Sequence, residues 1–265
     1  MSLPDHFLPA LSAIAHRAGQ DIMKIYAEPI KASTKDDLSP VTEADLAAER
    51  IILEALADLA PDIPVISEEA ASQGRIPQAG ARFFLVDPLD GTREFISRNG
   101  EFTINIALIE QGLPCMGVVY APAIERIFRG HHLKGAEQAK LSVENKPDQA
   151  QWQKIQAFPL PRRLRVVASR SHRDAETDAF LASREIGELV AAGSSLKFCL
   201  IAAGEADLYP RFGRTMEWDT AAGHAVLLAA GGNVTLADEK TPLSYGKTER
   251  GYDNPAFIAW GAANS

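Results

Sequence analysis

The ten residues V86-D-P-L-D-G-T-R-E-F95 follow an apolar run and place two aspartates, Asp87 and Asp90, three positions apart in one turn. Two carboxylates this close raise each other's cost of ionisation unless a cation or a proton lies between them. Carboxylate and carbonyl oxygens suit hard cations such as Mg²⁺, and a turn can aim both aspartates and the Leu89 carbonyl at one small volume. The stretch therefore predicts a divalent-metal site at the end of a buried strand.

The residues after the second aspartate predict an anion site beside that metal site. Gly91 and Thr92 open a short helix that runs through Phe95, and the unpaired N–H groups at the start of a helix attract anions. Two metal ions about 3.5–4 Å apart would stabilise both the attacking and the leaving oxygen of a phosphoryl transfer. Metal carboxylates next to a helix N-terminus are thus suited to handling phosphate.

Three further carboxylates stand at the ends of predicted elements: Asp45, Glu68 and Asp219. Each has an ordinary alternative explanation. Glu68 can be a solvated strand end, Asp45 can belong to the capping box that begins at Thr42, and Asp219 can be the N-cap of a helix. The D-P-L-D-G stretch is also common turn chemistry. These alternatives explain each acid singly, but they do not explain why so many acids end strands or start helices.

The composition sets the class of protein. The chain has 265 residues, of which 46% are hydrophobic and 23% charged, with a formal net charge of −8. It is long enough for one large core or two coupled halves. No basic face for nucleic acid is evident, although bound metal ions let an acidic protein handle an anionic substrate. We expect a cytoplasmic protein with no integral membrane segment, and we leave loose attachment to the inner membrane face open.

Motifs for other chemistries are missing. The sequence contains no G-x-G-x-x-G or Walker pattern. It places no serine or cysteine in a nucleophile elbow and no histidine as the obvious base of one, which disfavours a covalent hydrolase. Cys115 and Cys199 lie in apolar segments without metal or redox spacing, and we expect buried free thiols.

The first 160 residues predict an α+β half that carries most of the metal ligands. Apolar residues recur at spacings of three and four over 5–27, which is typical of an amphipathic helix, and a second helix follows from Thr42 to about Leu59. A polar loop is expected between these helices, over 31–40. Strands are expected over 61–69, 82–90 and 125–130, with two more around a Gln-Gly turn within 102–122. The pattern indicates helices packed against a largely antiparallel sheet.

Residues 161–265 predict an α/β half that supplies Asp219 and substrate contacts. Strands expected over 164–169, 188–193, 206–212 and 233–237 alternate with helices expected over 173–184, 194–204 and 219–232. Such alternation favours an α/β layer. The polar residues 131–162 are expected to form loops and short strands that lead to a boundary near residue 160.

Two motifs resemble a known superfamily. D87-P-L-D-G-T92 together with W218-D-T-A-A-G223 resembles the Mg²⁺-dependent, Li⁺-sensitive phosphatases related to inositol monophosphatase and fructose-1,6-bisphosphatase. The resemblance implies a mixed α+β and α/β fold, a layered αβαβα sandwich. Within the superfamily, the stretches 39–45, 90–102, 117–122 and 208–213 resemble the bacterial 3'(2'),5'-bisphosphate nucleotidases, and the match runs from about residue 10 to 257. One departure is Phe84, where the superfamily usually has tryptophan; this side chain is expected in the core.

The resemblance implies a set of metal ligands. Glu68, Asp87 and the Leu89 carbonyl would hold a first Mg²⁺. Asp87, Asp90 and Asp219 would hold a second, with Asp87 bridging the two ions. Two or three Mg²⁺ ions are expected, together with inhibition by Li⁺.

The resemblance also implies catalytic roles. Glu68 and Thr92 would orient and deprotonate the attacking water, with Asp45 hydrogen-bonded to Thr92. The amides of Gly91 and Thr92 would hold the phosphate, and Asp219 would lie near the leaving oxygen.

The substrate implied by the resemblance is adenosine 3',5'-bisphosphate, a by-product of sulfate assimilation, which would be cleaved to AMP and phosphate. Its second phosphate needs cations away from the metals, and the candidates are Lys197 and Arg211, with Arg170 and His172 behind them. The nearest alternative is the same chemistry on inositol monophosphate or a sugar phosphate. A catalytically idle nucleotide sensor is disfavoured because Thr92 and the metal acids are all present. We expect a monomer or weak homodimer whose partner is this small molecule.

Overall fold

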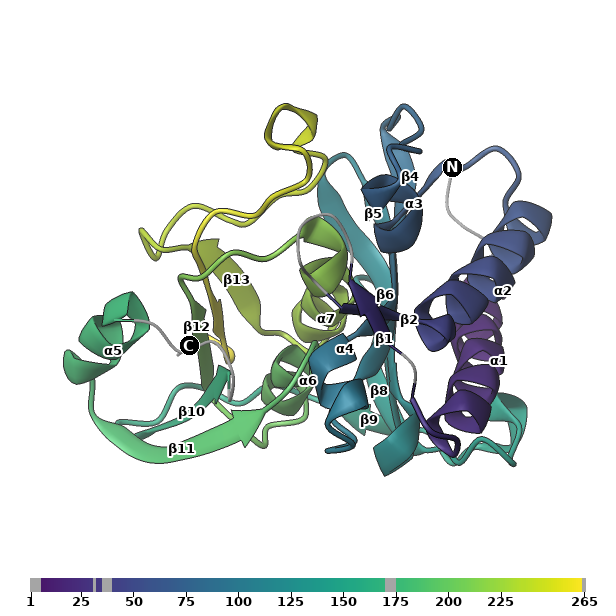
Figure 1. The fold of residues 1–265 in the computed structure, drawn as a ribbon. Coiled ribbons are helices and arrows are strands. Elements are labelled where there is room, and N and C mark those ends of the chain that lie inside the picture. Colours follow the sequence, from purple (N-terminus) through teal and green to yellow (C-terminus); the bar gives the residue numbers. More distant parts are fainter. Residues whose placement is uncertain (1–5, 31, 35–39, 170–174, 264–265) are drawn as a thin grey trace.

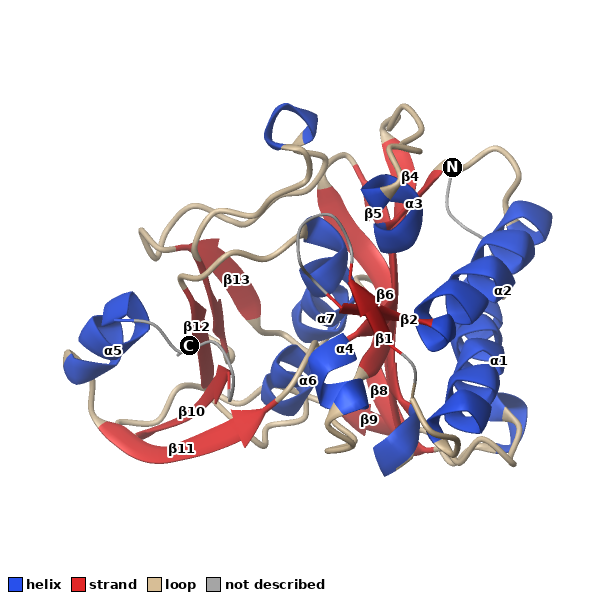
Figure 2. Cartoon of the chain, in the orientation of Figure 1, coloured by secondary structure: helices blue, strands red, loops and turns tan. Residues whose placement is uncertain are grey.

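The computed structural model describes residues 6–30, 32–34, 40–169 and 175–263. Figure 1 shows five layers: helices α1 and α2, a large sheet, helices α6 and α7, a small sheet, and helix α5. Figure 2 shows how helices and strands alternate from layer to layer. This arrangement confirms the layered αβαβα sandwich that the resemblance implied.

The large sheet has the strand order β3-β4-β5-β6-β7-β8-β9, and only β3 and β4 run parallel to each other. This confirms the prediction of a largely antiparallel sheet. Its strands are β3 (Val65–Ser67), β4 (Arg82–Asp90), β5 (Thr103–Glu110), β6 (Leu113–Ala121), β7 (Arg126–His131), β8 (Gly135–Lys140) and β9 (Gln153–Ile155).

Strand β4 is buried on both of its faces. Phe83 and Leu85 pack into the core on the α6–α7 side, whereas Phe84 and Val86 pack on the α1–α2 side. Successive side chains of a strand point to opposite faces, so a strand covered on both sides needs a continuous apolar run. The run that precedes Asp87 is therefore a structural requirement, and Phe84 lies in the core as predicted.

The outer helices are α1 (Phe7–Tyr26) and α2 (Glu43–Leu59), both close to the predicted ranges. The capping box at the start of α2 is confirmed, because the Thr42 amide donates to Asp45 Oδ2 at 2.8 Å and the Thr42 hydroxyl accepts from the Ala44 amide. The connection between the helices was predicted to be a polar loop only. It contains a short antiparallel pair, β1 (Ala32–Thr34) and β2 (Pro40–Thr42).

The small sheet has the strand order β11-β10-β12-β14-β13. Strand β10 (Leu164–Ser169) is parallel to β11 (Ile186–Ala192) and β12 (Leu208–Arg211), whereas β14 (Phe257–Trp260) is antiparallel to β12 and to β13 (Asn233–Leu236). Helix α5 (Ala175–Ala182) covers its outer face. The sequence did not predict β14. The division into halves at residue 160 stays a prediction.

Two short helices follow the strands that end at the predicted metal site. Helix α3 (Glu68–Ser72) begins directly after β3, so Glu68 starts a helix instead of ending a strand. Helix α4 (Thr92–Ile96) follows β4, as the sequence predicted. Both cysteines are buried and free, again as predicted. Within the described ranges, no helix is long and apolar enough to cross a membrane.

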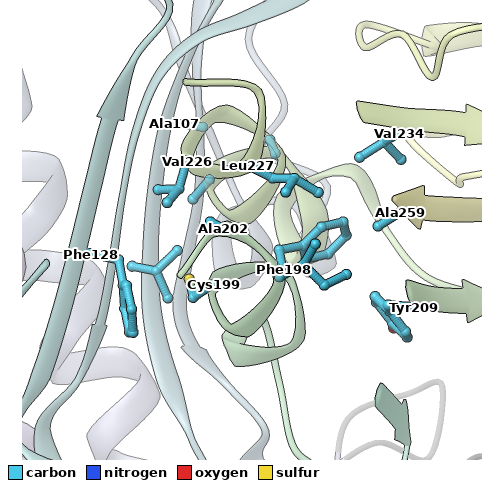
Figure 3. Close-up of a cluster of buried hydrophobic side chains, with 14 of the residues drawn as sticks. Ala107, Phe128, Phe198, Cys199, Ala202, Tyr209, Val226, Leu227, Val234 and Ala259 are labelled. Carbon is cyan, nitrogen blue, oxygen red and sulfur yellow. The ribbon is translucent and has the colours of Figure 1, made fainter. Parts of the chain in front are cut away.

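Helices α6 (Leu196–Ala202) and α7 (Glu217–Ala229) form the middle layer and are largely buried. Figure 3 shows Phe198, Cys199 and Ala202 of α6 and Val226 and Leu227 of α7 between the two sheets. The large sheet contributes Ala107 and Phe128, and the small sheet contributes Tyr209, Val234 and Ala259. This cluster therefore joins the large sheet to the small sheet through α6 and α7.

Gly117 on β6 allows α7 to approach the large sheet closely. A Cβ atom at this position would lie 2.6 Å from the Ala222 carbonyl oxygen and 2.8 Å from the Ala225 Cβ atom. We expect Gly117→Ala to lower the free energy of unfolding by about 1–3 kcal/mol through overpacking, measured by urea unfolding. Gly80→Ala is the matched control, since a Cβ atom there meets nothing closer than 3.8 Å. Equal stability of both variants would contradict the packing account.

Candidate active site

A pocket of about 350 Å³ opens where the end of β4, helix α4 and the starts of α6 and α7 meet. It brings together nine of the residues predicted from the sequence: Glu68, Asp87, Leu89, Asp90, Gly91, Thr92, Lys197, Arg211 and Asp219. Asp45 does not line the pocket and instead contacts Thr92. Arg170 and His172, the two reserve candidates, lie outside the described residues.

The turn at the end of β4 is shaped by an irregularity in strand pairing. Asp87 pairs with Asn105 and Asp90 pairs with Thr103, with a register shift between the two pairs. Proline at position 88 cannot donate a hydrogen bond to a neighbouring strand, which suits a bulge. Gly91 has a φ of 91°, a left-handed conformation that favours glycine. These local features turn the chain so that both aspartates line the pocket.

Each of the three aspartates is anchored by a backbone N–H group. Asp87 Oδ1 accepts from the Leu89 amide at 3.0 Å, Asp90 Oδ2 from the Ser195 amide at 2.7 Å, and Asp219 Oδ2 from the Met216 amide at 2.9 Å. One oxygen of each carboxylate is thereby fixed by the protein. Each anchor limits where the second oxygen can lie, which contributes to the preorganisation that a metal site requires.

Burial and crowding raise the pKa of all three aspartates. Burial is the main cause at Asp87 and Asp219, and neighbouring carboxylates, including Glu68 and Asp90, raise the pKa of both further. Burial also raises the pKa of Asp90 to about 6, although Lys197 acts in the opposite direction. A divalent cation among these groups would favour their ionised forms.

The donor chemistry therefore fits Mg²⁺, which binds carboxylate and carbonyl oxygens. The side chains are not gathered into a ready-made cluster: in the part of the chain that the structure describes, no three His, Cys, Asp or Glu side chains form such a group. Three observations support a Mg²⁺ site here: the donors are oxygens, the three aspartates are anchored, and neighbouring acids raise the pKa of Asp87 and Asp219.

Thr92, which is partly exposed, forms a hydrogen-bonded pair with the buried Asp45. The Thr92 hydroxyl donates to Asp45 Oδ1 at 3.1 Å, while Asp45 Oδ2 accepts from the amide and the hydroxyl of Thr42. Asp45 is thus both the capping-box residue and the partner of Thr92, so the two explanations offered by the sequence are compatible. Asp219 lines the pocket, but it is not the N-cap that the sequence offered as its alternative explanation. Helix α7 begins at Glu217 after the N-cap Met216, and Asp219, the third residue of the helix, accepts from the Met216 amide.

Two cationic side chains share the pocket with the carboxylates. Lys197 is only 5% exposed; its Nζ atom donates to the Ser194 carbonyl at 2.7 Å and lies 5.1 Å from the centre of the Tyr209 ring. Burial lowers the pKa of Lys197 to about 8; Asp90 raises it and Arg211 lowers it. Arg211 donates from Nε to the Gly213 carbonyl at 3.1 Å. The cations therefore provide a positive region beside the acidic one.

Sequence reasoning missed the groups that hold Asp90. The Ser195 amide reaches it from 105 positions along the chain, and the Asn105 side chain donates to the same carboxylate oxygen at 3.3 Å. A signal for Asn105 was present, since an amide inside the apolar run T-I-N-I-A-L-I needs a buried partner. No local signal connects Ser195 to Asp90.

The pocket combines carboxylates, the backbone amides at the start of α4 and two cations. These are the groups that a metal-dependent phosphatase, a hydrolase of phosphoric monoesters, uses. The sequence matches the inositol monophosphatase family over residues 3–261. The chain belongs to the inositol monophosphatase family, whose members are metal-dependent phosphatases.

Relatives and a solved structure agree with this assignment. The chain is 48% identical to the 3'(2'),5'-bisphosphate nucleotidase CysQ of Salmonella typhimurium over 252 residues, which cover 94% of this chain and 98% of that protein. It is 46% identical to the protein of the same name from Escherichia coli, with the same coverage. The crystal structure of CysQ from Bacteroides thetaiotaomicron superposes with a TM-score of 0.81 at 37% identity, covering 98% of this chain and 99% of that one.

Proposed function

We propose that this protein is a Mg²⁺-dependent 3'(2'),5'-bisphosphate nucleotidase that hydrolyses adenosine 3',5'-bisphosphate to AMP and phosphate. The observation that carries the proposal is the presence of Lys197 and Arg211 in the pocket that holds the predicted metal carboxylates. A substrate with two phosphates would present one to the carboxylate side and the other to the cations. The names of the relatives support the same substrate class.

The ligands of the metal ions are the acids of the pocket. Glu68, Asp87 and the Leu89 carbonyl would hold one Mg²⁺, and Asp87, Asp90 and Asp219 the second. When bound, Mg²⁺ supplies charge neutralisation for the phosphoryl group and lowers the pKa of water. We further propose two or three ions per site and inhibition by Li⁺.

The side chains of this pocket would carry the proton transfers. The Thr92 hydroxyl donates a hydrogen bond to Asp45, so its oxygen lone pairs remain to accept a hydrogen bond from the attacking water and orient it. Glu68 takes the proton of that water as it attacks phosphorus. The amides of Gly91 and Thr92 hold the phosphate oxygens. As the P–O ester bond breaks, the leaving oxygen near Asp219 takes up a proton from a water molecule. Glu68 returns its proton to solvent, and AMP and phosphate are released.

Lys197 is expected to discriminate between one and two phosphates. Lys197→Ala should raise KM for adenosine 3',5'-bisphosphate by about 10–100-fold, because it removes one charge-assisted hydrogen bond. It should raise KM for a monophosphate substrate much less. Steady-state phosphate release measures both constants, with Lys140→Ala as the control, since Lys140 is 83% exposed. Equal effects on both substrates would remove Lys197 from this role.

Two further expectations concern the protein as a whole. The cytoplasmic location, with loose membrane attachment left open, stays a prediction, as does the monomeric or weakly dimeric state. An idle nucleotide sensor is disfavoured because Thr92 and every acid of the proposed metal site are present in the sequence.

A further inference from the structure

Asp90 is held from two sides at the same oxygen atom. The Ser195 amide donates to Asp90 Oδ2 at 2.7 Å from the segment before α6. The Asn105 side-chain amide donates to the same atom at 3.3 Å from strand β5. Two donors on Oδ2 fix the rotation of the carboxylate and leave Oδ1 as the oxygen that a cation would use.

Asn105 is itself oriented by Thr103. The Thr103 hydroxyl donates to Asn105 Oδ1 at 3.0 Å, and both residues are fully buried. Because a hydroxyl donates to the amide oxygen, the NH₂ group of the amide must point the other way, toward Asp90. Residues two apart on a strand share a face, and this face of β5 lies alongside the turn, since Thr103 pairs with Asp90 and Asn105 with Asp87.

A buried amide in an apolar strand is costly unless its hydrogen bonds are made. Here the two hydrogen bonds, from Thr103 to Asn105 and from Asn105 to Asp90, form a side-chain relay that ends on a carboxylate of the proposed metal site. The other two anchored aspartates, Asp87 and Asp219, take their anchors from backbone amides close to them in sequence. Asp90 therefore receives a side-chain relay from another strand in addition to its backbone anchor.

We propose that Asn105, oriented by Thr103, is a positioning residue that locks the Asp90 carboxylate in the rotation needed to bind the second metal ion. The inference rests on the proposed metal site. Partners of this kind around ligating side chains typically contribute about 10–100-fold to metal affinity. Without the amide, Asp90 keeps only the Ser195 amide, and part of the binding free energy would go into fixing its rotation.

The test is Mn²⁺ binding to the full-length protein without substrate, by calorimetry and electron paramagnetic resonance. Asn105→Ala should weaken one binding step by about 10–100-fold and leave the other within about twofold. Thr103→Val should weaken the same step. Thr103→Ser, which keeps the hydroxyl, should bind Mn²⁺ in that step with wild-type affinity. Activity of Asn105→Ala should recover toward wild type as Mg²⁺ is raised, with KM for the nucleotide unchanged at saturating metal.

The variants also separate positioning from folding. Thermal unfolding in EDTA checks that each variant is folded. If Asn105→Ala does not fold, the Mn²⁺ affinity of Thr103→Val provides the test. Wild-type Mn²⁺ affinity in a folded Asn105→Ala variant would overturn the inference. Equal weakening of both Mn²⁺ binding steps, or a loss of activity that added metal does not reverse, would show that the relay has only a structural role. Either result would also overturn the inference. A wild-type protein that binds no Mn²⁺ would instead overturn the metal site itself.

Discussion

Asp90→Asn is expected to lower kcat by about a thousandfold, which corresponds to about 4 kcal/mol of transition-state stabilisation. The substitution keeps an oxygen that can accept from the Ser195 amide, so the local geometry is preserved. It removes one negative charge from the proposed ligands of the second metal ion. Phosphate release at saturating Mg²⁺ measures the effect.

The control for this variant is a change of the same chemistry away from the pocket. Asp62→Asn alters an exposed acid in the loop before β3 and should leave kcat unchanged. In EDTA, Asp90→Asn should melt at or above the wild-type temperature, because one buried carboxylate has been removed from a crowded acidic site. A rate near wild type would contradict the two-metal assignment.

Thr92→Val is expected to lower kcat by about 10²–10³-fold, within the range for loss of a group that assists proton transfer. Valine has nearly the shape of threonine and lacks the hydroxyl that donates to Asp45 at 3.1 Å. The backbone amides of Gly91 and Thr92 remain, so KM for the substrate should change little. Steady-state kinetics at saturating Mg²⁺ separate the two constants.

Thr92→Ser is the matched variant, since serine keeps the hydroxyl and loses only a methyl group. We expect its kcat to stay within about tenfold of wild type. A loss in Thr92→Ser as large as that in Thr92→Val would assign the effect to packing. Wild-type kcat in Thr92→Val would remove the hydroxyl from the mechanism.

The parts of the site that were predictable from sequence are those made by neighbours along the chain. The turn from Asp87 to Thr92, the start of α4 and the Thr42–Asp45 capping box depend on hydrogen bonds and backbone conformations that span a few residues. Local preferences therefore fix them. The capping bond of Asp219 to the Met216 amide also spans only three positions, although the sequence pattern placed the helix start at Asp219 and not at Glu217.

The parts that were not predictable depend on distant pairing. The hydrogen bond from the Ser195 amide to Asp90 joins residues 105 positions apart, and strand β14 pairs between β12 and β13 in the small sheet. Residues 31–40 were expected to form a loop because their polar composition hides the short pairing of β1 with β2. Periodicity reports which face of an element is buried, but it does not report which partner covers that face.

The most direct test of the proposed function is phosphate release with Mg²⁺ from adenosine 3',5'-bisphosphate and from inositol 1-phosphate at equal concentrations, each repeated with EDTA. We predict that kcat/KM for the nucleotide is higher by about 100-fold, since two cations are proposed to bind the second phosphate, and that EDTA abolishes both activities. Preference for inositol 1-phosphate would keep the metal site but contradict the nucleotide assignment, and activity that persists in EDTA would contradict the metal-dependent mechanism itself.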